Sequence, residues 1–383
     1  MEQDVCCAVN KTEYSWLQTP ELLRNIAEKA EAVSAGLWYL HADGRLHLCA
    51  LWGRQDLSGS SFAPGEGLCG TAFAENAVYS ADLVEDDASV LALDPGARAA
   101  AAMPVAEGEN VLGALHVSAN RVSGLADRMK AAMQPYLADL TRILGDYTGK
   151  NIPERPVFAA LRDVTVTERD GSELRTVLSE VNLTLREGEL LCVLGGRCSG
   201  KTTLCSVATG LDVPDVGTYT RENKDFFRLS EAKRRKFRLE EVGYVSAEAG
   251  FLQDLTVGEN LQLLSRGNRE KVQDALCFAG LQEHSRTFPD RLSAFERRRA
   301  ELAGARMKAE SLLVADEPEA ELGSSRDAIT ALLKFCADEG KRAVLFATSA
   351  ENTAAAAHRV VKLEDGAVCS MAVNPLTEGE AKP

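Results

Sequence analysis

A segment with the spacing of a phosphate-binding loop begins at Gly195 and reads GGRCSGKT through Thr202. In such a loop, glycines let backbone amides face an anion, and the following helix adds its positive end. Lys201 brings a mobile positive charge for the outer phosphates, and the hydroxyl of Thr202 can ligate magnesium. The apolar stretch ELLCVLGG before the loop and TTLCSVATGL after it are typical of a strand and a helix. The predicted nucleotide-binding residues are Gly195, Gly196, Arg197, Cys198, Ser199, Gly200, Lys201, Thr202 and Thr203.

A second apolar run, SLLVADEP, ends in two carboxylates, Asp316 and Glu317. An acidic residue at the end of such a strand can hold magnesium through water, so Asp316 and Thr202 are the predicted metal residues. A neighbouring carboxylate can orient an attacking water, which makes Glu317 the candidate catalytic base.

Four segments, GGRCSGKTT, LTVGENL, LSAFERRRAELAGA and LLVADEP, together resemble the ATP-binding cassette (ABC) ATPases over about residues 157 to 372. The segment RLSEAKRRKFRLEEVGYV is most similar to the subgroup that serves lipoprotein export, macrolide export and cell division. The resemblance implies an α/β P-loop domain with a helical subdomain, which binds ATP and magnesium. It also implies a homodimer, or a heterodimer with another cassette, in which each phosphate loop meets the partner's signature motif and closure moves a membrane permease.

The signature motif departs from the family pattern. Where the family has LSGGQ or LSGGE, this chain has Leu292, Ser293, Ala294, Phe295 and Glu296. The family's glycines let a helix N-terminus approach the partner's γ-phosphate. The ring of Phe295 is therefore expected to block that approach or to distort the loop, whereas Ser293 could still donate a hydrogen bond.

Further departures fall on the residues that the family uses for chemistry. The family's glutamine is replaced by Ala247, with Glu248 beside it, and its switch histidine is replaced by Ser349. The family's loop aspartate is replaced by Gly323, and a glycine of the phosphate loop is replaced by Cys198. Thr167 and Glu168 stand where the family has an aromatic residue that stacks on adenine. We expect the chain to bind nucleotide and to hydrolyse it slowly or only with a partner. An ordinary ATPase whose motifs deviate from the family pattern is the alternative, because Glu317 is present. The sequence does not distinguish ATP from GTP as the nucleotide. Cys198 is either an oxidisable thiol or a small residue tolerated in the loop.

The residues before the cassette pattern predict a helix, two hairpins and a closing helix. The helix lies in PELLRNIAEKAEAVSAG, the hairpins in LWYLHADGRLHLCALWG and AAAMPVAEGENVLGALHVSA, and the closing helix over residues 125 to 147. With GEGLCG and Pro104, this order resembles a GAF domain, which implies an antiparallel sheet with helices that encloses a small ligand or dimerises. His41 and His47 lack metal-ligand spacing and are predicted to be structural, and Cys49 and Cys69 to be buried thiols.

The 383 residues are enough for two domains, in an α/β fold class throughout. The predicted parts are an N-terminal extension (1–14), a GAF-like sensory or dimerisation domain (15–148), a linker (149–156), the ABC domain (157–372) and a flexible tail (373–383). Through Lys150 there are 11 basic and 20 acidic residues, and after it 32 basic and 37 acidic, so neither part is basic and nucleic acid is not expected. The chain is predicted to be cytoplasmic, or peripheral to the membrane through a permease. This prediction rests on ten cysteines without a C-x-x-C pair and on the lack of a signal peptide and of a long apolar run in the sequence.

Two functions fit these features. In the first, the chain is a regulator whose cassette binds ATP and dimerises, with the GAF-like domain biasing assembly. In the second, it is the ATP-hydrolysing subunit of a transporter with a separate permease. A third possibility, an interaction scaffold, requires that Lys201 can be replaced without effect.

Overall fold

The computed structural model describes residues 15–53, 57, 59–82, 97–121, 124–148, 150, 152–170, 173–246, 250–340 and 342–375. By internal contacts the chain divides into two units, which are treated separately below. One unit contains the residues up to Glu154 and those from Cys369 on, and the other is Arg155–Val368. Within the described ranges, no helix combines the length and the apolar character that a membrane span requires. The predicted N-terminal extension and the tail beyond residue 375 lie outside the described residues.

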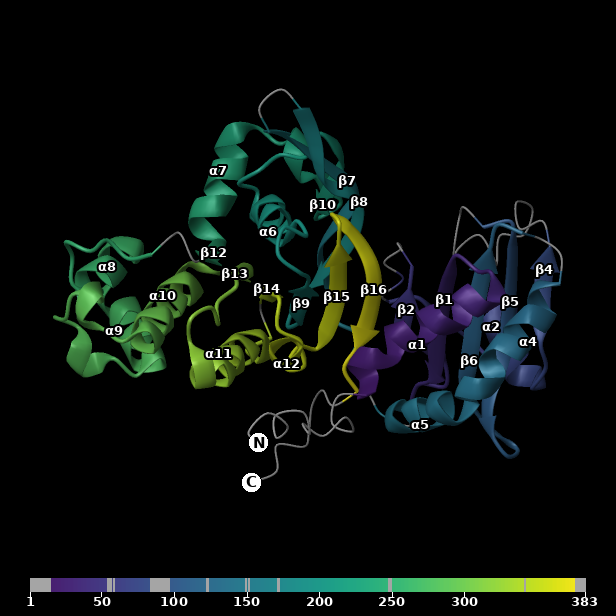
Figure 1. The fold of residues 1–383 in the computed structure, drawn as a ribbon. Helices are drawn as coiled ribbons and strands as arrows, with labels where there is room; N and C mark the ends of the chain where they lie inside the picture. The colour runs from purple at the N-terminus through teal and green to yellow at the C-terminus, as the bar shows by residue number, and fades with distance from the viewer. Residues whose placement is uncertain are drawn as a thin grey trace, which may run out of the picture. The chain divides into compact units, whose positions relative to one another are not determined.

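The first unit is an antiparallel sheet with helices packed on it (Figure 1). Its strands lie in the order β16-β2-β1-β6-β5-β4, and β3 pairs with β2. The elements are α1 (Ser15–Ala30), β1 (Ser34–Leu40), β2 (Leu46–Trp52), β3 (Ser61–Phe62), α2 (Gly67–Glu75), β4 (Tyr79–Asp82), β5 (Ala99–Glu107), β6 (Asn110–Ala119), α4 (Leu125–Met133), the 3-10 turn η2 (Gln134–Tyr136), α5 (Leu137–Tyr147) and β16 (Ala367–Val373). The two predicted hairpins correspond to β1–β2 and β5–β6.

Apolar side chains at helical spacing hold these helices to the sheet. Leu23 and Ile26 of α1 and Leu140 and Leu144 of α5 are fully buried. Within each helix they are three or four residues apart, the spacing of one buried helix face. In the first hairpin, Tyr39 lies opposite His47, and Gly44 has a φ of 81° in the turn. A glycine accepts this left-handed conformation without steric cost.

The second unit contains a parallel sheet, a separate antiparallel sheet and a group of helices. The elements are β7 (Val157–Asp170), β8 (Glu173–Arg186), β9 (Leu190–Leu194), α6 (Lys201–Thr209), β10 (Val216–Arg221), β11 (Lys224–Asp225), η3 (Phe226–Arg228), α7 (Glu231–Glu240), β12 (Val242–Val245), α8 (Val257–Leu264), α9 (Arg269–Ala279), η4 (Gln282–His284), η5 (Pro289–Arg291), α10 (Ala294–Lys308), β13 (Leu312–Asp316), η6 (Gly323–Ser325), α11 (Arg326–Asp338), β14 (Ala343–Thr348), α12 (Glu351–Ala354) and β15 (Arg359–Glu364). The parallel strands follow the order β12-β13-β14-β9-β15, and the antiparallel sheet the order β11-β10-β7-β8.

The helices α8, α9 and α10 gather beside the strands as a helical subdomain with its own apolar core (Figure 1). Val257 and Leu261 of α8 and Leu276 of α9 are buried in this core, together with Leu292 just before α10. The predicted fold class is therefore confirmed: both halves are α/β, the first has an antiparallel sheet with helices, and the second carries a helical subdomain.

The observed units differ from the predicted boundaries at the end of the chain. The cassette pattern was expected to reach residue 372, whereas the second unit ends at Val368. Residues Ser370 to Ala372 of β16 pair with β2, and the amide of Gly53 donates to Cys369 O at 3.0 Å. The unit to which these residues belong follows from their pairing with β2. The sequence contains no signal that identifies β2 as their partner strand.

Candidate functional site

The phosphate loop connects β9 to α6, and its backbone requires glycine. All five residues of β9 are buried, which fixes the start of the loop at the carboxyl end of a central strand. Gly200 has a φ of 97°, and a Cβ there would lie 2.8 Å from Val177 O. A Cβ on Gly195 would lie 2.4 Å from the hydroxyl of Ser199. These contacts leave no room for a side chain at either position, so the loop keeps the tight shape that an anion needs.

The side chain of Lys201 reaches back across the loop. Its ammonium donates to the carbonyl oxygens of Gly195 at 3.0 Å and Gly196 at 2.8 Å. It also lies 3.4 Å from Oε1 of Glu317, and the residue is only 5% exposed. A buried ammonium needs such oxygen partners, and phosphate oxygens can replace them.

The predicted metal residues meet in the structure. Thr202 Oγ1 donates to Oδ2 of Asp316 at 2.7 Å. Thr202 is the second residue of α6, the helix after β9, and Asp316 ends β13. Parallel strands bring their carboxyl ends to one edge of the sheet. A hydroxyl and a carboxylate are oxygen ligands of the kind that magnesium prefers, so these residues fit the ion that the resemblance implies.

Glu317 projects into the same region from a strained backbone. Its φ is 45°, and its amide donates to Ala347 O at 3.0 Å, which fixes the turn after β13. Its side chain is 45% exposed. A non-glycine residue in the left-handed region costs free energy, and such positions often occur at functional sites.

These residues surround a cleft of about 640 Å³, a volume typical of small-molecule sites. Seven predicted nucleotide-binding residues line it, Arg197 to Thr203, together with Asp316 and Glu317. Gly195 and Gly196 contribute the carbonyl groups that hold Lys201. The structure therefore brings together the phosphate loop, the predicted metal residues and the candidate base.

Sequence reasoning missed other residues of this cleft. Arg169, Arg175, Val177, Tyr244 and Ser246 line it, and Glu168 lies where the family has its stacking aromatic. Arg175 and Glu168 are opposite each other in the β7–β8 ladder. β7 and β8 are each 14 residues long, so their pairing extends to Glu168 and Arg175. The sequence does not show that this end of the two strands borders the phosphate loop.

The degenerate signature motif lies outside the cleft, at the start of α10. Ser293 is the N-cap of this helix and forms a capping box with Glu296. The carboxylate of Glu296 accepts from the amide of Ser293 at 2.9 Å and from its hydroxyl at 2.7 Å. These bonds lower the pKa of Glu296, first through the Ser293 hydroxyl. Phe295 is partly buried, with the guanidinium of Arg299 at 4.7 Å from its ring centre. Glu296 therefore caps the start of α10, and it matches the last residue of the LSGGE form of the family motif.

The remaining departures have individual structural settings. Ser349 is exposed and does not line the cleft, and Gly323 has a φ of 53°. Thr167 donates through its amide and hydroxyl to Asp215, at 2.7 and 2.8 Å. Cys198 is exposed, with a φ of 62°, which explains why glycine suits this position. Ala247 and Glu248 lie outside the described residues.

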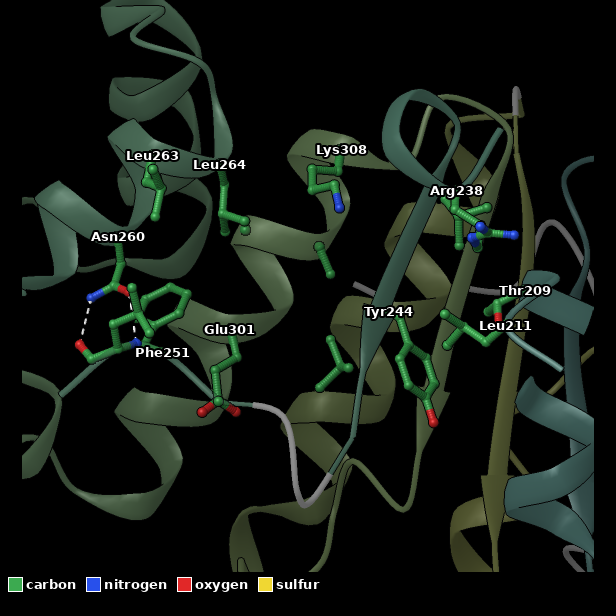
Figure 2. Close-up of a pocket in the computed structure, with 16 residues that line it drawn as sticks. Thr209, Leu211, Arg238, Tyr244, Phe251, Asn260, Leu263, Leu264, Glu301 and Lys308 are labelled. Atoms are coloured by element: carbon green, nitrogen blue, oxygen red, sulfur yellow. Dashed lines mark hydrogen bonds between the residues drawn. The ribbon is translucent and has the colours of Figure 1, made fainter. Parts of the chain in front are cut away.

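A second cleft, of about 320 Å³, separates the helical subdomain from the strands (Figure 2). One side of the cleft is formed by the helices, with Leu263 and Leu264 of α8 and Glu301 and Lys308 of α10. Tyr244 of β12 lies on the other side. Leu211, Leu252 and Leu263 at its rim are 53%, 55% and 61% exposed. Hydrogen bonds at 2.8 and 3.0 Å join Asn260 to the backbone of Leu252 and hold this rim.

Comparisons with known proteins match both units. Residues 178–320 match the ABC transporter family and residues 17–144 the GAF domain family. A macrolide export ATP-binding/permease protein MacB of Vibrio parahaemolyticus is 30% identical over 57% of this chain, but this chain spans only 34% of that relative's length. The lipoprotein-releasing system ATP-binding protein LolD of Shewanella frigidimarina is 31% identical, over 51% of this chain and 86% of LolD.

An uncharacterized ABC transporter ATP-binding protein of Mycobacterium tuberculosis is 30% identical, over 55% of this chain and 89% of its own length. Among solved structures, a dimeric ATP-binding cassette in a post-hydrolysis state, bound to ADP and Pi, matches with a TM-score of 0.50 and 28% identity, over 55% of this chain and 96% of that one. The phosphate loop and the strand that ends in Asp316 both fall within the matched family range. The chain therefore belongs to the ABC transporter ATP-binding proteins, with a GAF domain preceding its cassette.

Proposed function

We propose that the cleft beside Lys201 binds a nucleoside triphosphate with magnesium, and that the chain hydrolyses it weakly or only with a partner. The observation that carries the proposal is the convergence of Lys201, Thr202 and Asp316 at one end of the sheet. The loop amides and Lys201 would hold the phosphates, while Thr202 and Asp316 would hold the metal. Bound magnesium would neutralise phosphate charge. Glu317 would accept a proton from, and orient, the attacking water.

Weak hydrolysis is supported by the partner groups that the family places around the γ-phosphate. In this chain the hydroxyl of Ser293 donates to the carboxylate of Glu296 at 2.7 Å. Phe295 replaces a glycine, and Ser349 replaces the switch histidine. Losing one hydrogen bond to a charged group costs about 1.5 to 3 kcal/mol, which is roughly tenfold to a hundredfold in rate or affinity. The groups that hold the phosphates and the metal are retained, whereas the adenine-stacking aromatic and the groups expected around the γ-phosphate are altered.

A regulatory role is supported by the combination of a retained binding site with a GAF domain. Nucleotide occupancy would promote pairing with a second cassette, either a copy of this chain or another protein. The GAF domain would bias this pairing through a small ligand or through its own dimerisation.

A transport role is the alternative, and the cleft in Figure 2 favours it. Exposed leucines at its rim offer an apolar surface that a permease could cover at the membrane. MacB and LolD are named for macrolide export and lipoprotein release, respectively. A partner cassette with an intact signature could then complete the site at Lys201 and Glu317.

Nucleotide affinity and turnover, measured on the same purified chain, test the proposal. Lys201→Ala should weaken binding of Mg-ATP by at least about tenfold, since it removes a charged partner of the phosphates. Lys236→Ala, at an exposed lysine on α7, is the matched control. Turnover that Glu317→Gln abolishes would favour the transport role, whereas binding without turnover would favour the switch. Unchanged affinity in Lys201→Ala would refute both.

A further inference from the structure

The first unit contains a cluster of metal-ligand side chains that no part of the nucleotide site uses. His41, Asp43 and His47 each offer one ligand atom, and these atoms lie within 4.8 Å of one another. The sequence suggested no metal spacing, because the two histidines are six residues apart. In a hairpin, however, the turn folds His41 and Asp43 back toward the strand that carries His47.

We propose that His41, Asp43 and His47 bind one divalent transition-metal ion of the zinc type. Two imidazoles and one carboxylate are ligands that zinc and cobalt accept, and three protein ligands leave a coordination position open to water or a small anion. The proposal concerns the GAF domain alone and is independent of nucleotide binding.

The distances within the cluster suit a shared ion. Oδ1 of Asp43 is 3.1 Å from Nδ1 of His41, and Oδ2 is 2.8 Å from Nε2 of His47. Zinc binds nitrogen and oxygen at about 2.0 to 2.2 Å, which places neighbouring ligands of a tetrahedral ion about 3.3 Å apart. The ring centres of the two histidines are 4.5 Å apart. Both rings therefore face the same carboxylate from positions that need only small shifts.

The hairpin fixes two of the ligands and leaves the third accessible. His41 is 7% and His47 8% exposed, so neighbouring groups restrict both rings, whereas the side chain of Asp43 is 41% exposed. The amide of His41 donates to Arg45 O at 2.9 Å, which closes the turn. Coordination through Nδ1 of His41 displaces the 3.2 Å bond from the Asp43 amide, which lies in this exposed turn where water can replace the ring. An ion can thus enter through the turn without unfolding the strands.

The charge around Asp43 also favours a cation. The nearest arginine side chain in sequence, that of Arg45, is bonded to Ser61 at 3.0 Å and Glu66 at 3.1 Å. An aspartate is ionised at neutral pH, so Asp43 brings a negative charge between the two histidines. Oε1 of Glu154 lies 3.9 Å from Nδ1 of His47 and adds a second negative charge near the cluster.

The test uses the full chain without nucleotide, stripped with a chelator and then titrated with Co²⁺ or Zn²⁺. We expect one equivalent of metal per chain, visible absorption bands of Co²⁺ in a low-symmetry site, and X-ray absorption of bound zinc that shows nitrogen and oxygen ligands without sulfur. His47→Gln and Asp43→Asn keep hydrogen-bonding side chains and should weaken metal binding at least tenfold. His284→Gln, at a histidine of the helical subdomain, should bind metal as the unmodified chain does.

Three outcomes would contradict the proposal. Absence of stoichiometric binding by the unmodified chain would overturn it, and this measurement needs no variant to fold. Sulfur ligands would overturn it too, because they would assign the metal to cysteines. Equal affinity in His47→Gln, Asp43→Asn and the unmodified chain would show that the three side chains form only a hydrogen-bonded network.

Discussion

The ammonium group of Lys201 lies 3.4 Å from the carboxylate of Glu317, and both project into the phosphate cleft. The same ammonium is held by the carbonyl groups of Gly195 and Gly196. The lysine is therefore paired with the residue proposed to orient water. Phosphate binding has to replace this pair, so Glu317 influences affinity as well as chemistry.

Glu317→Gln should tighten nucleotide binding by about twofold to fivefold. The substitution removes a negative charge that faces the phosphates and releases Lys201 from a pair. Because Glu317 is about half exposed, solvent limits the effect to roughly 0.4 to 1 kcal/mol. Titration with a fluorescent nucleotide at low salt measures it, and Glu270→Gln on α9 is the control. Weaker binding in Glu317→Gln would show that the carboxylate helps to hold the nucleotide.

The phosphate loop and the strand ending in Asp316 could be predicted because each combines a local motif with an apolar run. The pairing of Thr202 with Asp316 also follows, since parallel strands end at one edge of a sheet. The approach of Arg175 to the loop, and the meeting of His41, Asp43 and His47, depend on strand register and on a turn. A single sequence predicts strand register only weakly, because register depends on both of the paired strands. The capping box at Ser293 could have been recognised from S-x-x-E, the usual sequence signature of a helix start.

Cys198→Gly should tighten nucleotide binding up to about fivefold. Cys198 has a φ of 62°, a conformation that costs a side-chain-bearing residue roughly 1 kcal/mol and glycine almost nothing. The variant would favour the loop shape that faces phosphate. Cys198→Ala removes the thiol but keeps the strain, so its affinity should stay near that of the unmodified chain. Equal gains in both variants would instead attribute the effect to the thiol.

Arg359→Met should lower the free energy of unfolding of the second unit by about 3 to 5 kcal/mol. Arg359 donates twice to Glu189, each time at 2.8 Å, and the residues are 2% and 5% exposed. Removing one partner leaves a buried charge without its counterion. Lys362→Met on the same strand breaks a half-exposed pair and should cost less than about 1 kcal/mol. Denaturant unfolding compares the two, and adding Glu189→Gln to Arg359→Met should recover part of the loss.

Acidification should destabilise the first unit through His116. Burial lowers the pKa of His116 from 6.5 to about 4, so the unfolded chain binds a proton between these values and the folded chain does not. The contribution to stability is complete above pH 6.5 and declines as pH falls toward 4, by about 2 kcal/mol between pH 7 and pH 5. His116→Gln keeps a polar group beside Ser118 and should reduce this decline. Denaturant unfolding of the first unit at both pH values measures it, and an unchanged slope in the variant would exclude His116 as the cause.

Restoring glycines at the signature motif should raise ATP turnover. Ala294 and Phe295 are the first two residues of α10, directly after the cap formed by Ser293. Ala294→Gly with Phe295→Gly removes the ring that faces Arg299 and uncovers the helix end, so a partner's γ-phosphate could approach. We expect at least a tenfold rise in turnover at concentrations that allow pairing, against roughly 1 kcal/mol of lost helix stability per glycine. Glu296→Gln keeps Phe295 in place and should leave turnover unchanged. If Glu296→Gln alone restored turnover, the carboxylate that caps α10 would be the block rather than the ring, because only the charge differs between these side chains.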